Sequence, residues 1–136
     1  MTQVASKPIQ VIKTDKAGPP VGPYSQGIKA GGFVFVAGEK GMDPVTKQIV
    51  PGGVEAETRR TLENIKAILE EAGSSMDLVV STFVFMTDLN EFSKMNVVYA
   101  EYFKANPPGR TTVGVTSLPA GAHVEITAFA LAGPAS

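Results

Sequence analysis

The stretch Leu78-Val79-Val80-Ser81-Thr82-Phe83-Val84-Phe85-Met86-Thr87 decides the fold class of this chain. It is rich in β-branched and aromatic residues, which favour a long central strand over a helix. Because successive side chains of a strand point to opposite faces, Phe83 and Phe85 share one face, and Val84 and Met86 share the other. The strand is therefore apolar on both faces, and the sheet that contains it needs an apolar layer on each side.

One helix is predicted before this strand and another after it. In residues 54–72 the apolar side chains recur at steps of three and four, at Leu62, Ile65, Leu69 and Ala72. Gly73 follows where a glycine commonly ends a helix. Asp88 and Glu91 have the spacing of a capping box and are expected to start the second helix, which the pair Pro107-Pro108 ends. Its apolar face consists of Phe92, Met95, Tyr99 and Tyr102.

Further strands are predicted at residues 24–29, 33–37, 48–50, 110–115 and 123–131. The first two are joined by the turn Ala30-Gly31-Gly32 as a hairpin. This order of elements predicts an α+β fold, in which two helices cover one face of a mixed sheet of five to six strands. We expect a single domain over residues 1–136, with residues 1–17 loosely ordered.

The face of the sheet without helices is predicted to be apolar too. Phe33 and Phe35 point opposite to Val34 and Val36, just as in the central strand. Two helices cover only one face, so a second copy of the chain is expected to bury the other. A closed symmetric ring is the economical form of such self-association.

Composition excludes several classes of function. Among the 136 residues, 12 Lys and Arg stand against 13 Asp and Glu, which gives a net charge of -1 and no basic run. Binding to nucleic acid is therefore not expected. The absence of cysteine excludes a thiolate nucleophile, and the single histidine, His123, excludes a site with several histidine ligands in one chain. We expect no metal and no cofactor.

The first sixteen positions are polar and lack the apolar core of a signal peptide, and no apolar run approaches the roughly 20 residues that span a bilayer. A cytoplasmic protein without a membrane segment is expected.

Two charged residues lie where they could do chemistry. Arg110 follows Asn106-Pro107-Pro108-Gly109 at the start of a strand, where its fork of donors could hold a carboxylate through two hydrogen bonds. Taken alone, the segment would also suit a solvated arginine at a strand end. Glu125 alternates with Val124 and Ile126 in the last strand. It could face water, or it could be shielded at a subunit boundary and act as a general base.

Other polar residues allow two interpretations each. Tyr24 is either a half-buried packing residue or a ligand contact. His123 has no evident partner and is interpreted as a structural or surface residue. Glu39 and Lys40, which follow the hairpin strand, are ambiguous.

Several segments together resemble the RidA/YjgF family, also called the L-PSP family. They are Gly22-Pro23-Tyr24-Ser25-Gln26-Gly27, Phe35-Val36-Ala37-Gly38-Glu39, Thr61-Leu62-Glu63-Asn64-Ile65, Phe85-Met86-Thr87-Asp88-Leu89, Pro108-Gly109-Arg110-Thr111-Thr112-Val113 and Val124-Glu125-Ile126. The resemblance covers residues 22–130. It implies a chorismate-mutase-like fold and a homotrimer whose sheets face a central barrel-like core, with clefts between subunits.

The resemblance also implies an activity: hydrolysis of reactive 2-enamino and 2-imino acids, such as 2-aminoacrylate, to 2-keto acids and ammonia. This reaction protects PLP enzymes from damage. By the same resemblance Arg110 holds the substrate carboxylate, and Glu125 positions or activates water. The implied substrate-binding residues are Tyr24, Ala37, Gly38, Glu39, Phe92, Asn96 and Thr112.

Three of these positions depart from common family residues: Ala37 and Glu39 stand where many relatives have Ser and Gln, and Thr112 stands where some relatives have Cys. Glu39 could therefore shift the choice of substrate. Two alternative functions stay open at this point: an endoribonuclease that inhibits translation, and a non-catalytic trimer that binds small carboxylates.

Overall fold

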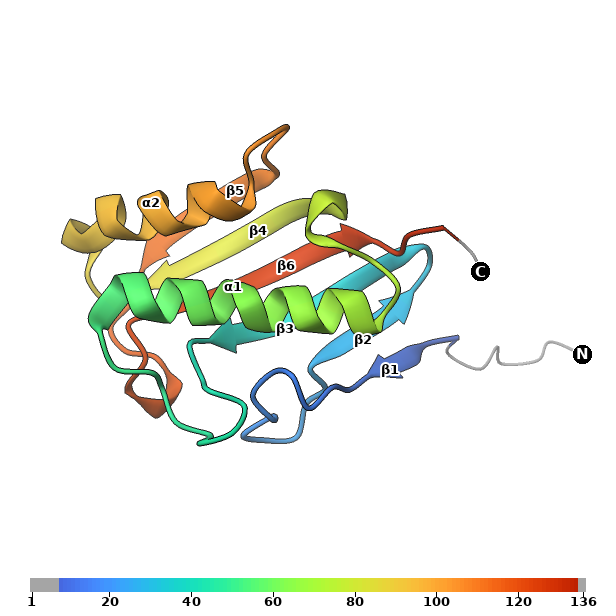
Figure 1. Cartoon of the computed structure of the whole chain (residues 1–136), viewed down its shortest axis with the longest axis horizontal. Coiled ribbons are helices and arrows are strands. Elements are labelled where there is room, and N and C mark those ends of the chain that lie inside the picture. Colours follow the sequence, from blue (N-terminus) through green and yellow to red (C-terminus); the bar gives the residue numbers. More distant parts are fainter. Residues whose placement is uncertain (1–7, 135–136) are drawn as a thin grey trace, which may run out of the picture.

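A six-stranded mixed sheet with two helices on one face forms the framework of the molecule (Figure 1). The computed structural model describes residues 8–134. The strands are β1 (Gln10–Ile12), β2 (Gly27–Ala30), β3 (Phe33–Lys40), β4 (Val79–Met86), β5 (Gly109–Gly114) and β6 (Val124–Leu131). The helices are α1 (Gly53–Glu71) and α2 (Phe92–Tyr102), with short 3-10 turns at Met76–Leu78, Leu89–Glu91 and Pro119–Gly121. This confirms the predicted α+β architecture.

The strand order is β1-β2-β3-β6-β4-β5, in which only the pair β4–β5 is parallel. The stretch that decided the fold class forms β4, which lies inside the sheet between β6 and β5. The predicted hairpin is the antiparallel pair β2–β3. No helix within residues 8–134 is both long and apolar enough to cross a membrane.

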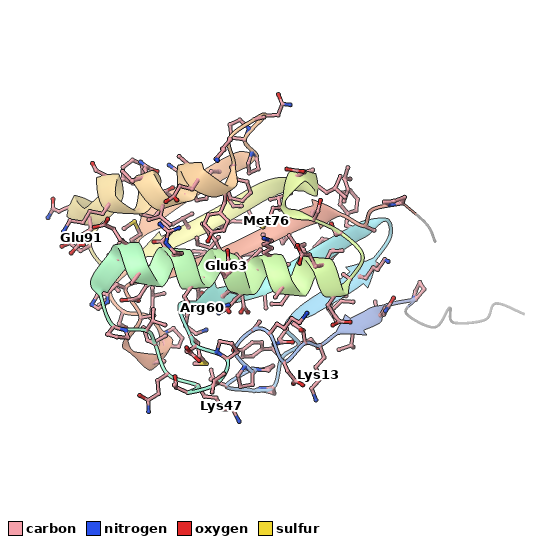
Figure 2. The ribbon with its side chains drawn as sticks, viewed as in Figure 1. Lys13, Lys47, Arg60, Glu63, Met76 and Glu91 are labelled. Atoms are coloured by element: carbon pink, nitrogen blue, oxygen red, sulfur yellow. The ribbon has the colours of Figure 1, made fainter. Side chains whose placement is uncertain are left out.

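The hydrophobic core lies between the sheet and the two helices. From α1, the side chains of Leu62, Ile65, Ile68 and Leu69 are fully buried. From the sheet, the buried side chains include Val34, Val36, Val84, Met86 and Ile126, which alternation had grouped on the faces opposite to Phe35, Phe85 and Glu125. Met76, in the segment between α1 and β4, packs against the same core (Figure 2). The apolar side chains that recur with the helical period in α1 and at every second residue in the strands thus pack together in one layer.

Buried polar side chains of α1 hold the ends of two strands. The Asn64 Nδ2 atom donates to the carbonyl oxygens of Lys40 at 3.1 Å and Met42 at 2.9 Å. The Glu57 Oε1 atom accepts from the backbone N–H of His123 at 2.8 Å. A Cβ at Gly41 would lie 2.7 Å from the Glu57 Cα atom, so the helix approaches this loop as closely as a glycine allows. α1 therefore fixes where β3 ends and β6 begins.

Local expectations at the chain start and around residue 49 are corrected. Residues 1–17 are not loose throughout, because residues 10–12 pair with β2 and the side chains of Ile12 and Ala17 are buried. Residues 1–7 lie outside the described part of the chain. The strand predicted at residues 48–50 is reduced to a single bridge between Met42 and Ile49.

The two helix ends follow the predicted residues with one correction. Gly73 has a φ of 82° and follows α1, as expected of a glycine that ends a helix. Asp88 Oδ1 accepts from the backbone N–H of Asn90 at 2.9 Å, so Asp88 is a cap. The reciprocal bond of a capping box is absent within residues 8–134, and Glu91 instead lies 3.8 Å from the Lys94 ammonium.

The helix-free face of the sheet carries a strip of aromatic rings, which we call the aromatic strip: Phe33, Phe35, Phe83 and Phe129. The ring centre of Phe35 lies 5.3 Å from that of Phe129 and 6.1 Å from that of Phe33. Phe33 and Phe35 remain 40% and 39% exposed in the single chain. The prediction that this face is apolar is confirmed, whereas its burial by another copy stays a prediction.

Replacing Ile65 with alanine should destabilise the fold strongly. Ile65 is fully buried on the sheet-facing side of α1, so its truncation leaves a cavity that costs about 2–5 kcal/mol. Urea unfolding at constant protein concentration measures this loss. Lys66→Ala on the exposed side of the same helix is the control, with an expected change below about 0.5 kcal/mol. Equal losses in the two variants would contradict the packing described.

Candidate active site

Arg110 is held on the edge strand β5 by two aromatic rings. Its guanidinium carbon lies 4.7 Å from the ring centre of Tyr99 and 5.4 Å from that of Phe92, both from α2. Tyr99 is fixed in turn, because its hydroxyl lies 2.7 Å from the Thr82 hydroxyl in a buried hydrogen bond. Stacking on rings leaves the N–H groups at the edge of a guanidinium free to bind a carboxylate. Within residues 8–134, Arg110 has no ion-pair partner.

Two further predicted residues lie on the same side of these elements. Asn96 follows Phe92 by four residues and precedes Tyr99 by three, so the three side chains share one side of α2. Thr112 lies two residues after Arg110 in β5 and therefore on the same face of the sheet. Its hydroxyl oxygen is buried and has no hydrogen-bond partner among the described residues. We call Arg110, Phe92, Asn96, Tyr99 and Thr112 the Arg110 cluster.

Glu125 lies in a different hollow, an open groove of about 280 Å³ that we call the Glu125 groove. Its lining residues are Val21, Tyr24, Ala37, Gly38, Lys40, Pro119 and Glu125. The carboxylate lies directly over the backbone of Gly38, where an added Cβ would be 2.7 Å from Glu125 Oε2. The Tyr24 hydroxyl accepts a hydrogen bond from the backbone N–H of Val21 at 3.1 Å. Four predicted site residues, Tyr24, Ala37, Gly38 and Glu125, are thus neighbours.

A bulge in β3 decides which residues enter this groove. Val36 pairs with Ala128 and Glu39 with Ile126, so three steps along β3 match two along β6. The extra residue turns Lys40 toward the helix-free face, where its ammonium lies 3.5 Å from Glu125 Oε1. Glu39 is turned to the other side. Regular alternation from Val34 and Val36 would give the opposite assignment.

Glu39 is therefore beside the Glu125 groove and not in its lining. It lines a much smaller neighbouring hollow with Gly18, Pro19, Tyr24, Lys40 and Met42. Its side chain is buried, and this burial raises the pKa of its carboxyl to about 8, against the smaller opposing effect of Lys40. At neutral pH this carboxyl is mostly protonated.

The two groups of candidate residues lie on opposite faces of the sheet. Arg110 pairs with Thr82, whose side chain is buried under the helices. Glu125 pairs with Phe85, on the helix-free face. Within one chain the sheet separates the guanidinium from the carboxylate, so the two do not share a pocket. The expectation that they meet between copies of the chain stays a prediction.

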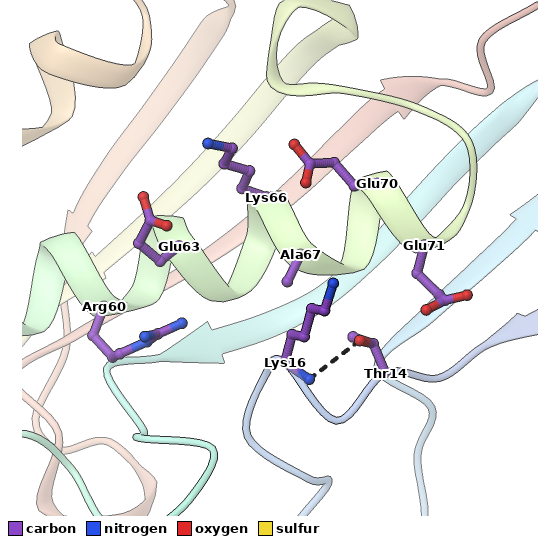
Figure 3. Close-up of a pocket in the computed structure, with 8 residues that line it drawn as sticks. All are labelled: Thr14, Lys16, Arg60, Glu63, Lys66, Ala67, Glu70 and Glu71. Atoms are coloured by element: carbon purple, nitrogen blue, oxygen red, sulfur yellow. Dashed lines mark hydrogen bonds between the residues drawn. The ribbon is translucent and has the colours of Figure 1, made fainter.

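A larger hollow of about 440 Å³ lies on α1, away from all predicted site residues (Figure 3). It is lined by Thr14, Lys16, Arg60, Glu63, Lys66, Ala67, Glu70 and Glu71. Two of its charged groups already have partners on the helices: Arg60 Nε donates to Asn64 Oδ1 at 3.0 Å, and Glu63 Oε2 accepts from the Tyr102 hydroxyl at 2.7 Å. The remaining ammonium and carboxylate groups at its rim are exposed, which is typical of a solvated helix surface.

Three features of the site were missed from the sequence. The sequence leaves the role of Lys40 ambiguous, and it places Tyr99 on the apolar face of a helix without identifying it as the support of Arg110. The sequence shows no evident partner for His123, but its Nδ1 atom lies 2.5 Å from Glu57 Oε2. This hydrogen bond raises the pKa of His123. The residue spacing carried no signal for these contacts, because each joins segments distant in sequence.

The family described as Endoribonuclease L-PSP matches residues 14–132 of the chain. The chain belongs to the RidA/YjgF (L-PSP) family. A RutC family protein of Pyrococcus abyssi is 52% identical over 121 residues, which are 89% of this chain and 95% of the relative. The 2-iminobutanoate/2-iminopropanoate deaminase of Homo sapiens is 42% identical over 125 residues, 92% of this chain and 91% of the relative.

The fold of this RidA/YjgF member is similar to that of a solved RidA structure. The crystal structure of RidA from an Antarctic Psychrobacter bacterium matches it with a TM-score of 0.87 at 41% identity, covering 90% of this chain and 98% of that one. The family resemblance drawn from the sequence is therefore confirmed.

Replacing Glu39 with glutamine should make stability less dependent on pH. In the folded chain the pKa of this carboxyl is about 8, whereas its ordinary value is 4.5. Below pH 4.5 both states hold the proton, and as the pH rises toward 8 only the unfolded state loses it. Wild-type stability should therefore fall over this range, while Glu39→Gln avoids the loss, on the order of a few kcal/mol at pH 8.

Urea unfolding of both proteins at pH 5 and pH 8, at the same protein concentration, checks this expectation. The stability difference between variant and wild type should be larger at pH 8. An identical difference at the two pH values would show that Glu39 does not stay protonated in the folded chain.

Proposed function

We propose that this protein hydrolyses reactive 2-enamino and 2-imino acids to 2-keto acids and ammonia, and so protects PLP enzymes from these metabolites. One observation carries the proposal: a guanidinium held on two aromatic rings at a sheet edge, with no carboxylate partner among residues 8–134. A fork of charged donors that is fixed but unpaired is suited to a small carboxylic acid. Relatives at 42% identity that are named 2-iminobutanoate/2-iminopropanoate deaminase support the choice of acid.

The proposed pocket forms between copies of the chain, in a homotrimer. The Arg110 cluster and the Glu125 groove lie on opposite faces of one sheet, so one complete site needs the cluster of one copy and the groove of the next. The exposed aromatic strip supports this assembly, because apolar rings gathered on one face are typical of a surface that another protein covers. A closed trimer gives every copy the same contacts and leaves no strip uncovered.

In this pocket Arg110 would orient the substrate through its carboxylate, and Glu125 would take a proton from the attacking water. Water adds to the carbon of the C=N bond, and the resulting carbinolamine releases ammonia to leave the keto acid. The uncatalysed reaction already proceeds in water, so orientation and acid-base help suffice.

The residues that depart from the family pattern bear on the choice of substrate. Ala37 lines the Glu125 groove without the hydroxyl of a serine, so it offers the ligand no side-chain hydrogen bond. Glu39 does not line the groove, and its mostly protonated carboxyl does little to repel an anionic substrate at neutral pH.

Substitution of Arg110 should abolish turnover without unfolding the chain. Arg110→Ala removes two charge-assisted hydrogen bonds to the carboxylate, so enzyme-dependent kcat/KM should fall by at least about 100-fold. Arg110→Lys should recover only part of it, because an ammonium cannot bind a carboxylate through a planar fork. Keto acid and ammonia are measured from amino acids passed through a PLP dehydratase, after subtraction of the spontaneous rate.

Arg59→Ala is the matched control, since Arg59 is half exposed and pairs with Glu101 on the surface. Its turnover should equal that of the wild type. Ligand-induced thermal stabilisation without ammonia release in the wild type would favour a non-catalytic carboxylate-binding protein instead. Cleavage of RNA by the wild type would support the endoribonuclease description that the family carries.

Placing a charge on the aromatic strip should separate the copies and remove activity together. Phe35→Asp introduces a carboxylate on the face that we assign to the trimer, where burial without a partner is costly. Sedimentation should show a smaller particle with native circular dichroism, and turnover should be lost. Val45→Asp, at a side chain that is 86% exposed, should leave size and turnover unchanged. A fully active Phe35→Asp monomer would exclude a site between copies.

A further inference from the structure

Lys40 is a buried lysine inside the proposed active site. It ends β3, its side chain is only 7% exposed, and it lines the Glu125 groove. The bulge in β3 turns it there, and bulges of this kind often redirect a side chain beside an active site. Lysine is rarely buried to this degree without a paired charge. A lysine in this position is therefore expected to pair with an opposite charge or to act on a ligand in the groove.

The partner of Lys40 is the carboxylate of Glu125, which under the proposed function takes a proton from the attacking water. The Lys40 Nζ atom lies 3.5 Å from Glu125 Oε1, and Glu125 is its one ion-pair partner within residues 8–134. Glu39, the neighbour in sequence, pairs on the other face of the sheet and forms no ion pair with Lys40 among the described residues, although both line the smaller hollow. An ammonium donates up to three hydrogen bonds, so Lys40 keeps donors for a ligand in the groove.

The backbone holds this ammonium in place. Asn64 donates to the carbonyl oxygen of Lys40 at 3.1 Å and anchors the end of β3 to α1. On the Glu125 side of the pair, Glu57 binds both the backbone N–H and the imidazole of His123, the residue that precedes β6. Acid and base are thus carried by two adjacent strands, whose ends are fixed by the same helix.

We propose that Lys40 is the proton donor of the hydrolysis and works as a pair with Glu125, the proton acceptor; this inference rests on the proposed function. In the first step Glu125 takes a proton from water as the oxygen bonds to the imine carbon. At the same time Lys40 gives a proton to the imine nitrogen. The product is a neutral carbinolamine, with Glu125 protonated and Lys40 as the free amine.

The pair resets itself before the second step. The proton on Glu125 passes to Lys40 across their contact, which restores the carboxylate and the ammonium. Glu125 then takes the proton of the carbinolamine hydroxyl while Lys40 protonates the amino group. The C–N bond breaks, the C=O bond forms and ammonia leaves. A second transfer across the pair returns both groups to their starting state, so one water is consumed and no proton is gained or lost by the enzyme.

A purely electrostatic role of Lys40 would produce a different pattern of variants. If Lys40 only held Glu125 in place by its charge, arginine would replace it. If Lys40 donates a proton, arginine would fail, because a guanidinium does not release its proton in proteins. Lys40→Arg and Lys40→Met therefore distinguish charge from proton donation.

The experiment measures steady-state keto-acid formation from dehydratase-generated imines for the wild type and these two variants, after subtraction of the spontaneous rate. In both variants kcat should fall by about 100-fold or more while KM changes little, since Arg110 binds the carboxylate. Lys66→Met removes an exposed lysine from α1 and should match the wild type. Thermal unfolding and sedimentation check that each variant is folded and assembled.

A third variant, Lys40→Ala, tests proton donation without relying on arginine. It leaves a space that methylamine or ethylamine can enter, and added amine should restore part of the lost rate. The same amine should not restore Lys40→Met, whose side chain fills the space. The reaction without enzyme corrects for direct attack of the amine on the substrate.

Wild-type kcat in Lys40→Arg or Lys40→Met, or a folded Lys40→Ala that no amine restores, would overturn this assignment and leave the proposed function standing. A wild-type protein that forms no keto acid above the spontaneous rate would overturn both.

Discussion

Apolar side chains on both faces of one sheet are the constraint on which the rest of this structure depends. β4 turns Val84 and Met86 toward α1 and α2, and it turns Phe83 and Phe85 away from them. The helices cover the first face completely and cannot reach the second. The buried side therefore stabilises the single chain, while the aromatic strip on the other side leaves it with a surface that favours association.

The polar residues of the site are distributed around this constraint. The Arg110 cluster uses the outer edge of the covered layer, where α2 supplies rings to support a cation. The Glu125 groove uses the uncovered face, where β3 and β6 lie side by side. Gly38 leaves room for this carboxylate, because a side chain at that position would force Glu125 to shift. Each set of residues is built from secondary structure with a fixed register, which suits the proposed reaction, since that reaction depends mainly on orientation of the substrate.

Much of the fold could be predicted because its signals are local. The helices and β4 follow from periodicity within one segment, and the buried face of β6 follows from simple alternation. β1 was missed because residues 10–12 form a strand only through pairing with β2, and Ile12 is buried only through tertiary contacts. Arg110 and Glu125 could be singled out by residue type and context. Their separation by the sheet could not, since it depends on the pairing of β5 with β4. The assignment of Glu39 and Lys40 to opposite faces depends on one extra residue in β3, which alternation cannot reveal.

The aromatic strip has a consequence for the life of a newly made chain. Under the proposed function, a newly folded single copy carries the Arg110 cluster and the Glu125 groove on separate faces, so neither forms a complete site. It also exposes the apolar aromatic strip. Catalytic activity then requires copies to meet and assemble. After synthesis it therefore rises more steeply than in proportion to the concentration of the chain. Dilution would reverse this, and a cell that makes very little of the protein would gain disproportionately little protection.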